Sequence, residues 1–274
     1  MPVDMLVHIL CGNTSGGCAK EAVPATALCG IVERYYWYEH QQEGTVWATL
    51  DGQPVLLFLL DAPYQIQFTG KYQVCMHDAF CCSQGLRQTY ITGLSPGMRI
   101  LAVKFSCTGL SMLMPGGNNM GGLSPLAPIY DLWGTAGRAL TVALRESSTV
   151  MSQRALLDQF LVEQLSLPAV DNHMLHLVVS RIRSKRGLLS VQHLCSELRL
   201  NYKWLERNFR RHLGTTPKRY IDTIRFLHAY LKIQEGGDDL VQIAYESGYY
   251  DHHHFVKVCR QHTGYAPSRL LSLA

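Results

Sequence analysis

The sequence predicts an α+β protein of two parts: a small β-barrel or half-barrel with following helices, and then an all-helical region that contains a helix-turn-helix unit twice. Three observations predict this architecture. β-forming residues cluster between glycine and proline breaks over residues 31–110. Helical periodicity replaces them over residues 131–167. One pattern then occurs twice, in residues 188–217 and in residues 239–267.

The strands are expected in segments that are rich in β-branched and aromatic residues, such as VERYYWYEH, PVLLFLLD and MRILAVKF. Short strands separated by turn residues form a small barrel or half-barrel. The helical segment over residues 131–167 leads from these strands towards the repeated region. We therefore expect a first domain over residues 1–165, which is β-barrel-like, has a helical tail, and serves in sensing or dimerisation.

The aromatic residues of this first domain have two interpretations. They can line a pocket for a small-molecule effector, or they can be ordinary core residues of a small β-domain, and both remain open. The candidate pocket residues are Tyr35, Trp37, Trp47, Phe58 and Tyr90. The histidines before residue 172 are His8, His40 and His77, and their spacing is not that of a metal site. We expect no metal, no cofactor and no enzymatic activity.

The first repeat contains an amphipathic helix followed by a second helix. Apolar residues recur at i, i+3, i+4 and i+7 in the first helix, which is the pattern of a helix with one buried face. They are Val191, Leu194, Cys195 and Leu198. Asn201 is a suitable N-cap for the second helix, in which Leu205 and Phe209 form an apolar pair. The opposite face of the second helix carries Lys203, Glu206, Arg207 and Arg210, and it is available to a groove.

The second repeat follows the same plan. Gly248 suits the turn between its helices, and Asp251 is placed to cap the second helix. That helix has Phe255 and Cys259 on its packing side, and its other side carries His252, His253, Lys257 and Arg260. The two helix-turn-helix units are expected at about residues 190–213 and 240–263, joined by a helix over residues 218–234.

Charge separates the two parts of the chain. Residues 172–274 hold 16 Lys and Arg and 8 Asp and Glu, a net charge of +8, whereas residues 1–171 hold 9 and 13, a net charge of −4. A basic module attracts the phosphates of nucleic acid through counterion release. The alternative is that these charges only belong to solvent-exposed helix faces. Their recurrence at matching positions of two repeats favours nucleic-acid binding.

The residues of the repeated region resemble the DNA-binding domain of AraC/XylS-type transcriptional regulators, over roughly residues 172–271. The matching segments are Arg207-Asn208-Phe209, Gly214-Thr215-Thr216-Pro217, Ile243-Ala244, Ser247-Gly248-Tyr249, Asp251, His254-Phe255 and Thr263-Gly264-Tyr265-Ala266-Pro267. The resemblance implies an all-helical DNA-binding domain over residues 172–274, in which the second helix of each unit enters the major groove of double-stranded DNA. It also implies a sequence-specific bacterial transcription factor that acts at a promoter or operator.

The resemblance also assigns roles to individual residues. Its base-facing positions correspond to Lys203, Glu206 and Arg207 in the first unit and to His252, His253 and Lys257 in the second. Arg207 is the strongest candidate for guanine, because a guanidinium can donate to O6 and N7 together. Other cationic residues are expected to hold phosphates, which position a protein without selecting sequence. These are Arg210, Arg211, Lys218, Arg219 and Arg260.

Several residues depart from the usual pattern of this family. Arg199 stands where a turn glycine is common, and Asn208 and Cys259 stand where larger apolar residues are usual. The resemblance places His254 towards the interior and its two histidine neighbours outside. Consecutive helical residues point about 100° apart, so we expect this histidine run to hold no metal.

The first domain shows a weaker resemblance to the cupin-like barrel found in a subset of AraC-type regulators. The matching residues include Tyr36-Trp37, Asp51-Gly52 with Pro54, Leu101-Ala102-Val103-Lys104-Phe105 and Leu132-Trp133-Gly134. In relatives, such domains sense a ligand, dimerise or contact other proteins. The implied partners are therefore a small-molecule effector, RNA polymerase or a second copy of the chain.

The nine cysteines contain no C-x-x-C pair, which argues against a zinc knuckle or a thioredoxin-like site. Cys81-Cys82 can be a redox sensor or buried strand residues, and the second interpretation is favoured. A reactive N-terminal cysteine would indicate a DNA-repair or DNA-modifying protein that uses the same DNA reader, which is the alternative function. The first residues lack a basic segment and no apolar run approaches a membrane span, so we expect a cytoplasmic protein without a membrane partner.

Overall fold

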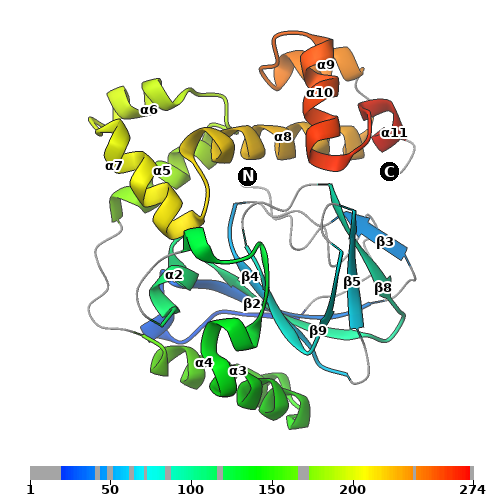
Figure 1. Ribbon diagram of the computed structural model, residues 1–274, viewed down its shortest axis with the longest axis vertical. Coiled ribbons are helices and arrows are strands. Elements are labelled where there is room, and N and C mark those ends of the chain that lie inside the picture. The colour runs from blue at the N-terminus through cyan, green and yellow to red at the C-terminus, as the bar shows by residue number, and fades with distance from the viewer. Residues whose placement is uncertain are drawn as a thin grey trace.

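The computed structural model of the chain describes residues 20–40, 44–47, 52–61, 65–70, 73–83, 88–115, 120–165, 173–236 and 239–271. The N-terminal part is rich in β-structure and the C-terminal part is helical, as the sequence predicts. Figure 1 shows the β-rich part below, helices α3 and α4 against its lower side, and the later helices in a separate layer above.

The β-rich part consists of two antiparallel sheets. The larger sheet has the order β1 (Lys20–Ala22), β2 (Val32–Glu39), β9 (Arg99–Phe105), β4 (Val55–Leu59), β7 (Ala79–Cys82) and β10 (Leu126–Pro128). The smaller sheet has the order β3 (Gly44–Trp47), β8 (Thr89–Leu94), β5 (Gln65–Gly70) and β6 (Val74–His77). Across the described residues the two sheets face each other as an open half-barrel, so of the two predicted forms the structure shows the open one.

Each face of the larger sheet supports its own hydrophobic core, because successive strand residues point to opposite faces. Tyr36 and Leu57 point towards the smaller sheet and pack with its Phe68 and Ile91. Tyr35 and Phe58 point the other way, into a core that includes residues of α3 (Ile129–Glu146) and α4 (Val150–Glu163). The sheet is therefore buried on both sides.

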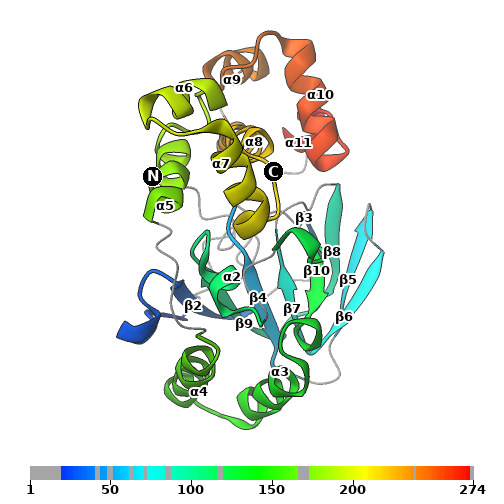
Figure 2. The same cartoon turned by 60° about the vertical axis from the view of Figure 1, so that its left-hand side comes forward.

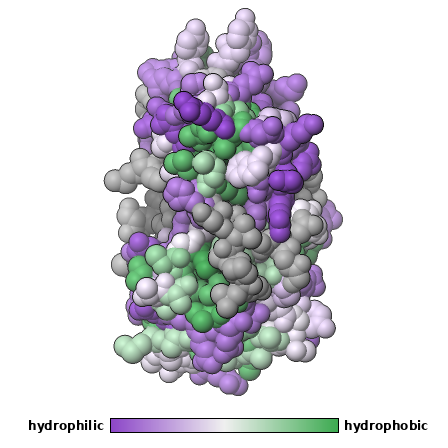
Figure 3. All heavy atoms as spheres, turned by 90° about the vertical axis from the view of Figure 1, so that its left-hand side faces the viewer, coloured by the Kyte–Doolittle hydropathy of each residue, from purple (hydrophilic) through white to green (hydrophobic). Residues whose placement is uncertain are grey.

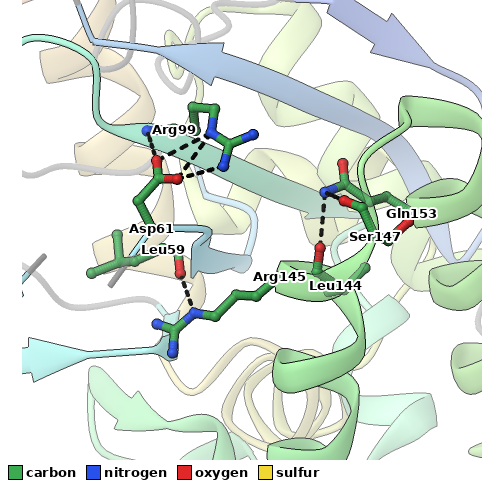
Figure 4. Close-up of polar contacts among 7 residues, drawn as sticks. All are labelled: Leu59, Asp61, Arg99, Leu144, Arg145, Ser147 and Gln153. Atoms are coloured by element: carbon green, nitrogen blue, oxygen red, sulfur yellow. Dashed lines mark hydrogen bonds and ion pairs between the residues drawn. The ribbon is translucent and has the colours of Figure 1, made fainter. Parts of the chain in front are cut away.

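Polar contacts fix α3 and α4 against the sheet. The Nε atom of Arg145 donates to the carbonyl oxygen of Leu59 over 2.9 Å, at the end of β4 (Figure 4). Gln153 on α4 donates to the carbonyl oxygens of Leu144 and Ser147, over 2.9 Å and 3.0 Å. Because these carbonyls lie at the end of α3, Gln153 supplies the partners that the last turn of a helix lacks.

The helical part follows in the order α5 (His173–Ser184), α6 (Val191–Glu197), α7 (Tyr202–Asn208), a π-helical turn η3 (Phe209–Leu213), α8 (Pro217–Glu235), α9 (Leu240–Glu246), α10 (His252–Thr263) and α11 (Pro267–Leu271). Figure 2 shows α6 and α7 on one side and α9 and α10 on the other, with α8 between them. None of the helices in the described residues is long and apolar enough to span a membrane.

Two short segments of the β-rich part, α2 (Gly109–Leu113) and η2 (Met120–Gly122), approach η3 of the helical part. There the Ser111 hydroxyl lies 2.9 Å from Nδ1 of His212, and the Thr108 hydroxyl lies 2.6 Å from Nε2 of His176. Figure 3 shows the side of the molecule on which α5 to α7 lie, with hydrophilic residues gathered over the helical part around a smaller apolar area.

Candidate nucleic-acid interface

The first helix-turn-helix unit is formed by α6, α7 and η3, and side-chain caps fix where its helices begin. The Ser190 hydroxyl accepts from the backbone N–H of His193 over 3.0 Å, at the start of α6. At the start of α7, Asn201 Oδ1 accepts from the N–H groups of Lys203 and Trp204, over 2.8 Å and 3.3 Å. The predicted cap by Asn201 is confirmed, and it satisfies backbone donors that a helix start leaves unpaired.

The second unit, formed by α9 and α10, repeats these caps with aspartates. The carboxylate of Asp239 accepts from the N–H of Val241 over 3.4 Å, and that of Asp251 accepts from the N–H of His254 over 2.7 Å. Asp251 is therefore the cap that the sequence predicts. A negative side chain at this position also interacts favourably with the helix dipole.

The turns inside the two units have the same backbone form but different residues. Arg199 takes a φ of +52° in the first unit, and Gly248 takes +71° in the second. In each turn the next N–H bonds back to the preceding helix, Leu200 to Cys195 over 2.8 Å and Tyr249 to Ala244 over 3.0 Å. The left-handed region is costly for residues with a side chain. The first unit nevertheless makes its turn with an arginine, where glycine is usual.

Each unit has its own core on the packing face of its second helix. Leu205 and Phe209 are fully buried with Leu194 in the first unit, and Phe255 and Cys259 are fully buried with Ile243 in the second. The predicted apolar pairs are confirmed. Asn208, the polar departure, is half-buried and donates from its amide to the Trp204 carbonyl oxygen over 2.8 Å, which leaves its amide nitrogen satisfied.

Most of the first unit's predicted contact residues lie around one open groove of about 1030 Å³. The base-facing and phosphate candidates that line it are Lys203, Glu206, Arg207, Arg210, Arg211 and Arg219. Gly214 and Thr216 form part of its wall, and Gly121 and Gly122 of the β-rich part contribute its edge. The groove thus combines one carboxylate with five cationic side chains, which gives it a strongly positive potential.

Two ion pairs involve predicted DNA-contact residues of the first unit. Glu206 receives a hydrogen bond from Arg210 over 2.9 Å, one helical turn further on. Lys218 stands outside the groove lining and donates to Asp222 over 2.8 Å. Both pairs are at i, i+4 spacing near the surface, where they contribute about 0.3–0.5 kcal/mol at most and can exchange for other partners.

The predicted contact residues of the second unit lie on α10. His252, His253, Lys257 and Arg260 are exposed on that helix, as predicted. His254 differs from the expectation, because it is exposed too, with its ring centroid 5.5 Å from that of Tyr249 in an edge-on arrangement. Its place beside the Asp251 cap, on the first turn of the helix, keeps it at the surface.

Of the aromatic residues expected to line an effector pocket, those whose side chains the structure describes lie in two separate places. Tyr35, Trp37 and Phe58 are buried in the core between the larger sheet and α3 and α4, where Tyr35 donates to Asp158 over 2.8 Å. Tyr90 lies elsewhere, beside Tyr265 of the helical part. The side chain of Trp47 lies outside the described residues. Tyr35, Trp37 and Phe58 are therefore core residues in this structure, and an effector site formed by the aromatic residues stays a prediction.

The adjacent Cys81 and Cys82 are buried strand residues of β7. Burial raises the pKa of the Cys82 thiol to about 12, and it raises the pKa of Cys81 well above its ordinary value. A protonated, buried thiol is a poor nucleophile and a poor redox sensor. Cys11 and Cys18 lie outside the described residues.

The sequence pattern did not indicate the contacts that hold the second unit to the β-rich part. The backbone N–H of Gln88 donates to the His262 carbonyl oxygen over 2.6 Å, and the Gln88 amide donates to the Arg260 carbonyl oxygen over 2.8 Å. The Tyr90 hydroxyl donates to the carbonyl oxygen of Thr263. These acceptors are carbonyls of the last turn of α10, where a helix leaves carbonyls without partners of its own, although that of Arg260 also accepts from the Gly264 N–H. They have no sequence signature of their own.

Comparison with known proteins gives matches to the C-terminal part of the chain. Residues 194–272 match the family model described as a helix-turn-helix domain. The transcriptional activator RhaS of Pectobacterium atrosepticum is 32% identical over 77 residues, which is 28% of this chain and 28% of that protein. The uncharacterized transcriptional regulator YidL of Escherichia coli is 32% identical over 82 residues, 30% of this chain and 28% of that protein.

The chain thus aligns with little more than a quarter of the length of these curated relatives. Among solved structures, ToxT of Vibrio cholerae is 16% identical, with 87% of this chain and 97% of that chain covered and a TM-score of 0.47. The family match and the curated relatives agree with the two capped, turn-linked helix pairs described above. Residues 194–272 of this chain therefore form a helix-turn-helix domain, within the region whose residues resemble the AraC/XylS type.

Proposed function

We propose that this protein is a sequence-specific transcriptional regulator that reads two successive major-groove segments with α7 and α10. The observation that carries the proposal is the pair of helix-turn-helix units, each with an exposed polar face, joined by one continuous helix. That helix, α8, has 19 residues. At a rise of about 1.5 Å per residue it is about 28 Å long, close to the roughly 34 Å between successive major-groove segments on one face of B-DNA.

We propose the following base contacts. Lys203, Glu206 and Arg207 act from the first unit, and His252, His253 and Lys257 act from the second. Arg207 suits guanine because its guanidinium can donate two parallel hydrogen bonds to one base edge. Glu206 suits a cytosine amino group, provided that its carboxylate leaves Arg210.

The remaining cations are proposed to hold phosphates. Arg210, Arg211 and Arg219 border the groove of the first unit, and Lys218 and Arg260 are exposed beside the two reading helices. Contacts of this kind supply affinity and fix register without choosing sequence. The net charge of +8 over residues 172–274 favours this role.

We further propose a division of labour along the chain, with residues 1–165 receiving a signal and residues 172–274 binding DNA. The signal is a small molecule or a protein partner such as RNA polymerase or a second copy of the chain. The hydrogen bonds of Gln88 and Tyr90 to the end of α10, and of Ser111 to His212, give the β-rich part direct contact with both units. A change in the β-rich part can therefore reach both reading helices.

The regulatory function is tested by recovering genomic fragments that the full chain binds and placing them before a reporter gene. The expected result is a change in reporter expression when the chain is present, and loss of that change in Arg207→Ala. Lys185→Ala is the matched control, because Lys185 is exposed and lies outside both reading helices. If no recovered fragment alters expression, or if Arg207→Ala acts like the control, the proposal is wrong.

A further inference from the structure

A cavity of about 440 Å³ lies between the β-rich part and α5, apart from the groove of the first unit. Its β-rich wall includes Glu33, Gln53 and Ser106, and its helical wall includes Ser180, Arg183 and Arg186. The volume is within the range of small-molecule sites. No residue of this cavity belongs to the proposed DNA contacts.

Two polar atoms in the cavity wall are buried without a hydrogen-bond partner. Gln53 and Ser106 are only 3% and 5% exposed, and neither Oε1 of Gln53 nor the Ser106 hydroxyl has a hydrogen-bond partner. The amide of Gln53 is oriented, because its Nε2 donates to a carboxylate oxygen of Glu33. Its Oε1 is therefore an acceptor. Buried polar groups are nearly always hydrogen-bonded, so these two atoms indicate a polar molecule in the cavity.

Charges of both signs face the cavity. Glu33 brings a carboxylate next to the Gln53 acceptor, and Arg183 and Arg186 bring guanidinium groups from the end of α5 and the turn after it. Cys107 also lines the cavity, and charges of both signs affect the pKa of its thiol. Burial, with a smaller contribution from the Glu33 charge, raises the pKa of its thiol to about 12, and the Arg183 charge opposes the rise. Glu33 and Arg183 thus act on one confined space.

We propose that this cavity binds a small zwitterion, such as an amino acid, with an ammonium group at Glu33 and Gln53 and a carboxylate at Arg183 and Arg186. The ammonium group supplies the N–H donors that the Glu33 and Gln53 oxygens accept. The carboxylate receives charge-assisted hydrogen bonds from the arginines. The Ser106 hydroxyl completes the set, because it can donate or accept.

Other classes of ligand fit this lining less well. An apolar molecule would leave the Gln53 and Ser106 atoms unpaired and would desolvate three charged side chains. A simple anion would face the Glu33 carboxylate, and a metal cation would face two guanidinium groups. A molecule that carries both charges fits the carboxylate and the two guanidinium groups of the lining together.

The position of the cavity connects it to the first helix-turn-helix unit. Leu175, Val178 and Ile182 of α5 pack in the same core as Leu205 and Phe209 of the first unit. A molecule held between the β-rich part and α5 therefore lies against the helix that supports this unit. The binding site itself stands whether or not the unit reads DNA.

The test is calorimetric titration of the full chain with 4-aminobutanoate and with each proteinogenic amino acid in turn. Butylamine and butanoate are the controls, because each carries only one of the two charges of 4-aminobutanoate. The expected result is saturable binding of at least one zwitterion, without binding of the two single-charge compounds. Absence of binding by every zwitterion, or equal binding of butanoate, would overturn the proposal.

Variants locate the binding in this cavity. Arg183→Met is expected to weaken the binding of that zwitterion at least about tenfold, because it removes a charge-assisted hydrogen bond. Ser106→Ala is expected to weaken it several-fold, and the melting temperature of the ligand-free protein should stay the same or rise, since an unpaired hydroxyl is removed. Lys185→Met, on an exposed residue outside the cavity wall, is the control. Unchanged affinity in both Arg183→Met and Ser106→Ala would show that the ligand binds elsewhere.

Discussion

Arg207 and Arg211 lie near each other, on α7 and on the π-helical turn η3 that follows it, and are proposed to contact different parts of DNA. Arg207 is exposed on α7, and Arg211 is exposed on the π-helical turn that follows. A base contact changes sequence preference, whereas a phosphate contact changes affinity for any duplex. The two residues therefore offer a paired test of their proposed roles.

We expect Arg207→Ala to reduce the binding free energy by about 1–3 kcal/mol on a matched duplex and by much less on a scrambled one. Arg211→Ala should weaken both duplexes alike and lower the slope of log affinity against log salt by about 1. Fluorescence anisotropy with both duplexes over a salt series measures both effects. Equal losses on the two duplexes for Arg207→Ala would contradict its proposed role as a base-reading residue.

The turn residues Arg199 and Gly248 give a second prediction at this scale. Arg199→Gly should stabilise the protein by about 0.5–1 kcal/mol, because Arg199 is exposed and holds a left-handed φ of +52°. Gly248→Ala should destabilise it by about 1 kcal/mol, since φ is +71°, where a side chain strains the backbone. Thermal melting separates the two signs. A lower melting temperature for Arg199→Gly would show that its side chain makes a compensating contact.

At the scale of elements, the π-helical turn η3 is docked on α2 through a buried histidine. His212 is 3% exposed and its Nδ1 lies 2.9 Å from the Ser111 hydroxyl. Burial, with smaller contributions from the charges of Arg211 and His176, lowers the pKa of His212 to about 4, from an ordinary value of 6.5. The folded protein therefore binds this proton more weakly than the unfolded chain does.

The stability of the protein should consequently fall as the pH drops from about 6.5 towards 4, where the unfolded chain takes up the proton first. His228, whose pKa burial also lowers to about 4, contributes in the same direction. His212→Gln should make the loss of melting temperature with falling pH less steep. An identical dependence of the melting temperature on pH for His212→Gln and the native chain would contradict this role of His212.

Local elements were predictable and their contacts were not. The caps Asn201 and Asp251, the apolar pairs of both units and the connecting helix depend on residues close in sequence, which is why spacing and residue type reveal them. The docking of His212 on Ser111 joins residues 101 positions apart. Such a contact leaves no periodic pattern, and Ser111 is an ordinary helix residue in the sequence.

In the protein as a whole, the same limit explains why the sequence left two interpretations open for the aromatic residues of the first domain. A run of aromatic strand residues does not say what covers each face of the sheet, and Tyr35 and Trp37 prove to face α4, through Asp158 and Gln153. The cavity beside α5 was missed because its wall comes from four separate parts of the chain, with few aromatic residues to mark it. Its signal is the unpaired atoms of Gln53 and Ser106, which only coordinates reveal.

The β-rich part also holds the second unit, and Tyr90 is the residue to test. Tyr90→Phe removes the hydroxyl that donates to the Thr263 carbonyl oxygen but keeps the ring beside Tyr265. We expect the free energy of unfolding to fall by about 0.5–1.5 kcal/mol and backbone hydrogen exchange in α10 and α11 to become faster. Exchange in α7, which lies in the other unit, should not change. Uniformly faster exchange in both units would show that Tyr90 supports the whole protein instead.

Selection of bound sequences from a random duplex pool tests whether α7 and α10 read DNA together. The full chain is used at about 150 mM salt, where purely electrostatic binding is weakened. We predict a bipartite motif with its two parts about one helical turn apart. Arg207→Ala should blur one part and Lys257→Ala the other. A motif with a single part, or one part lost in both variants, would contradict the claim.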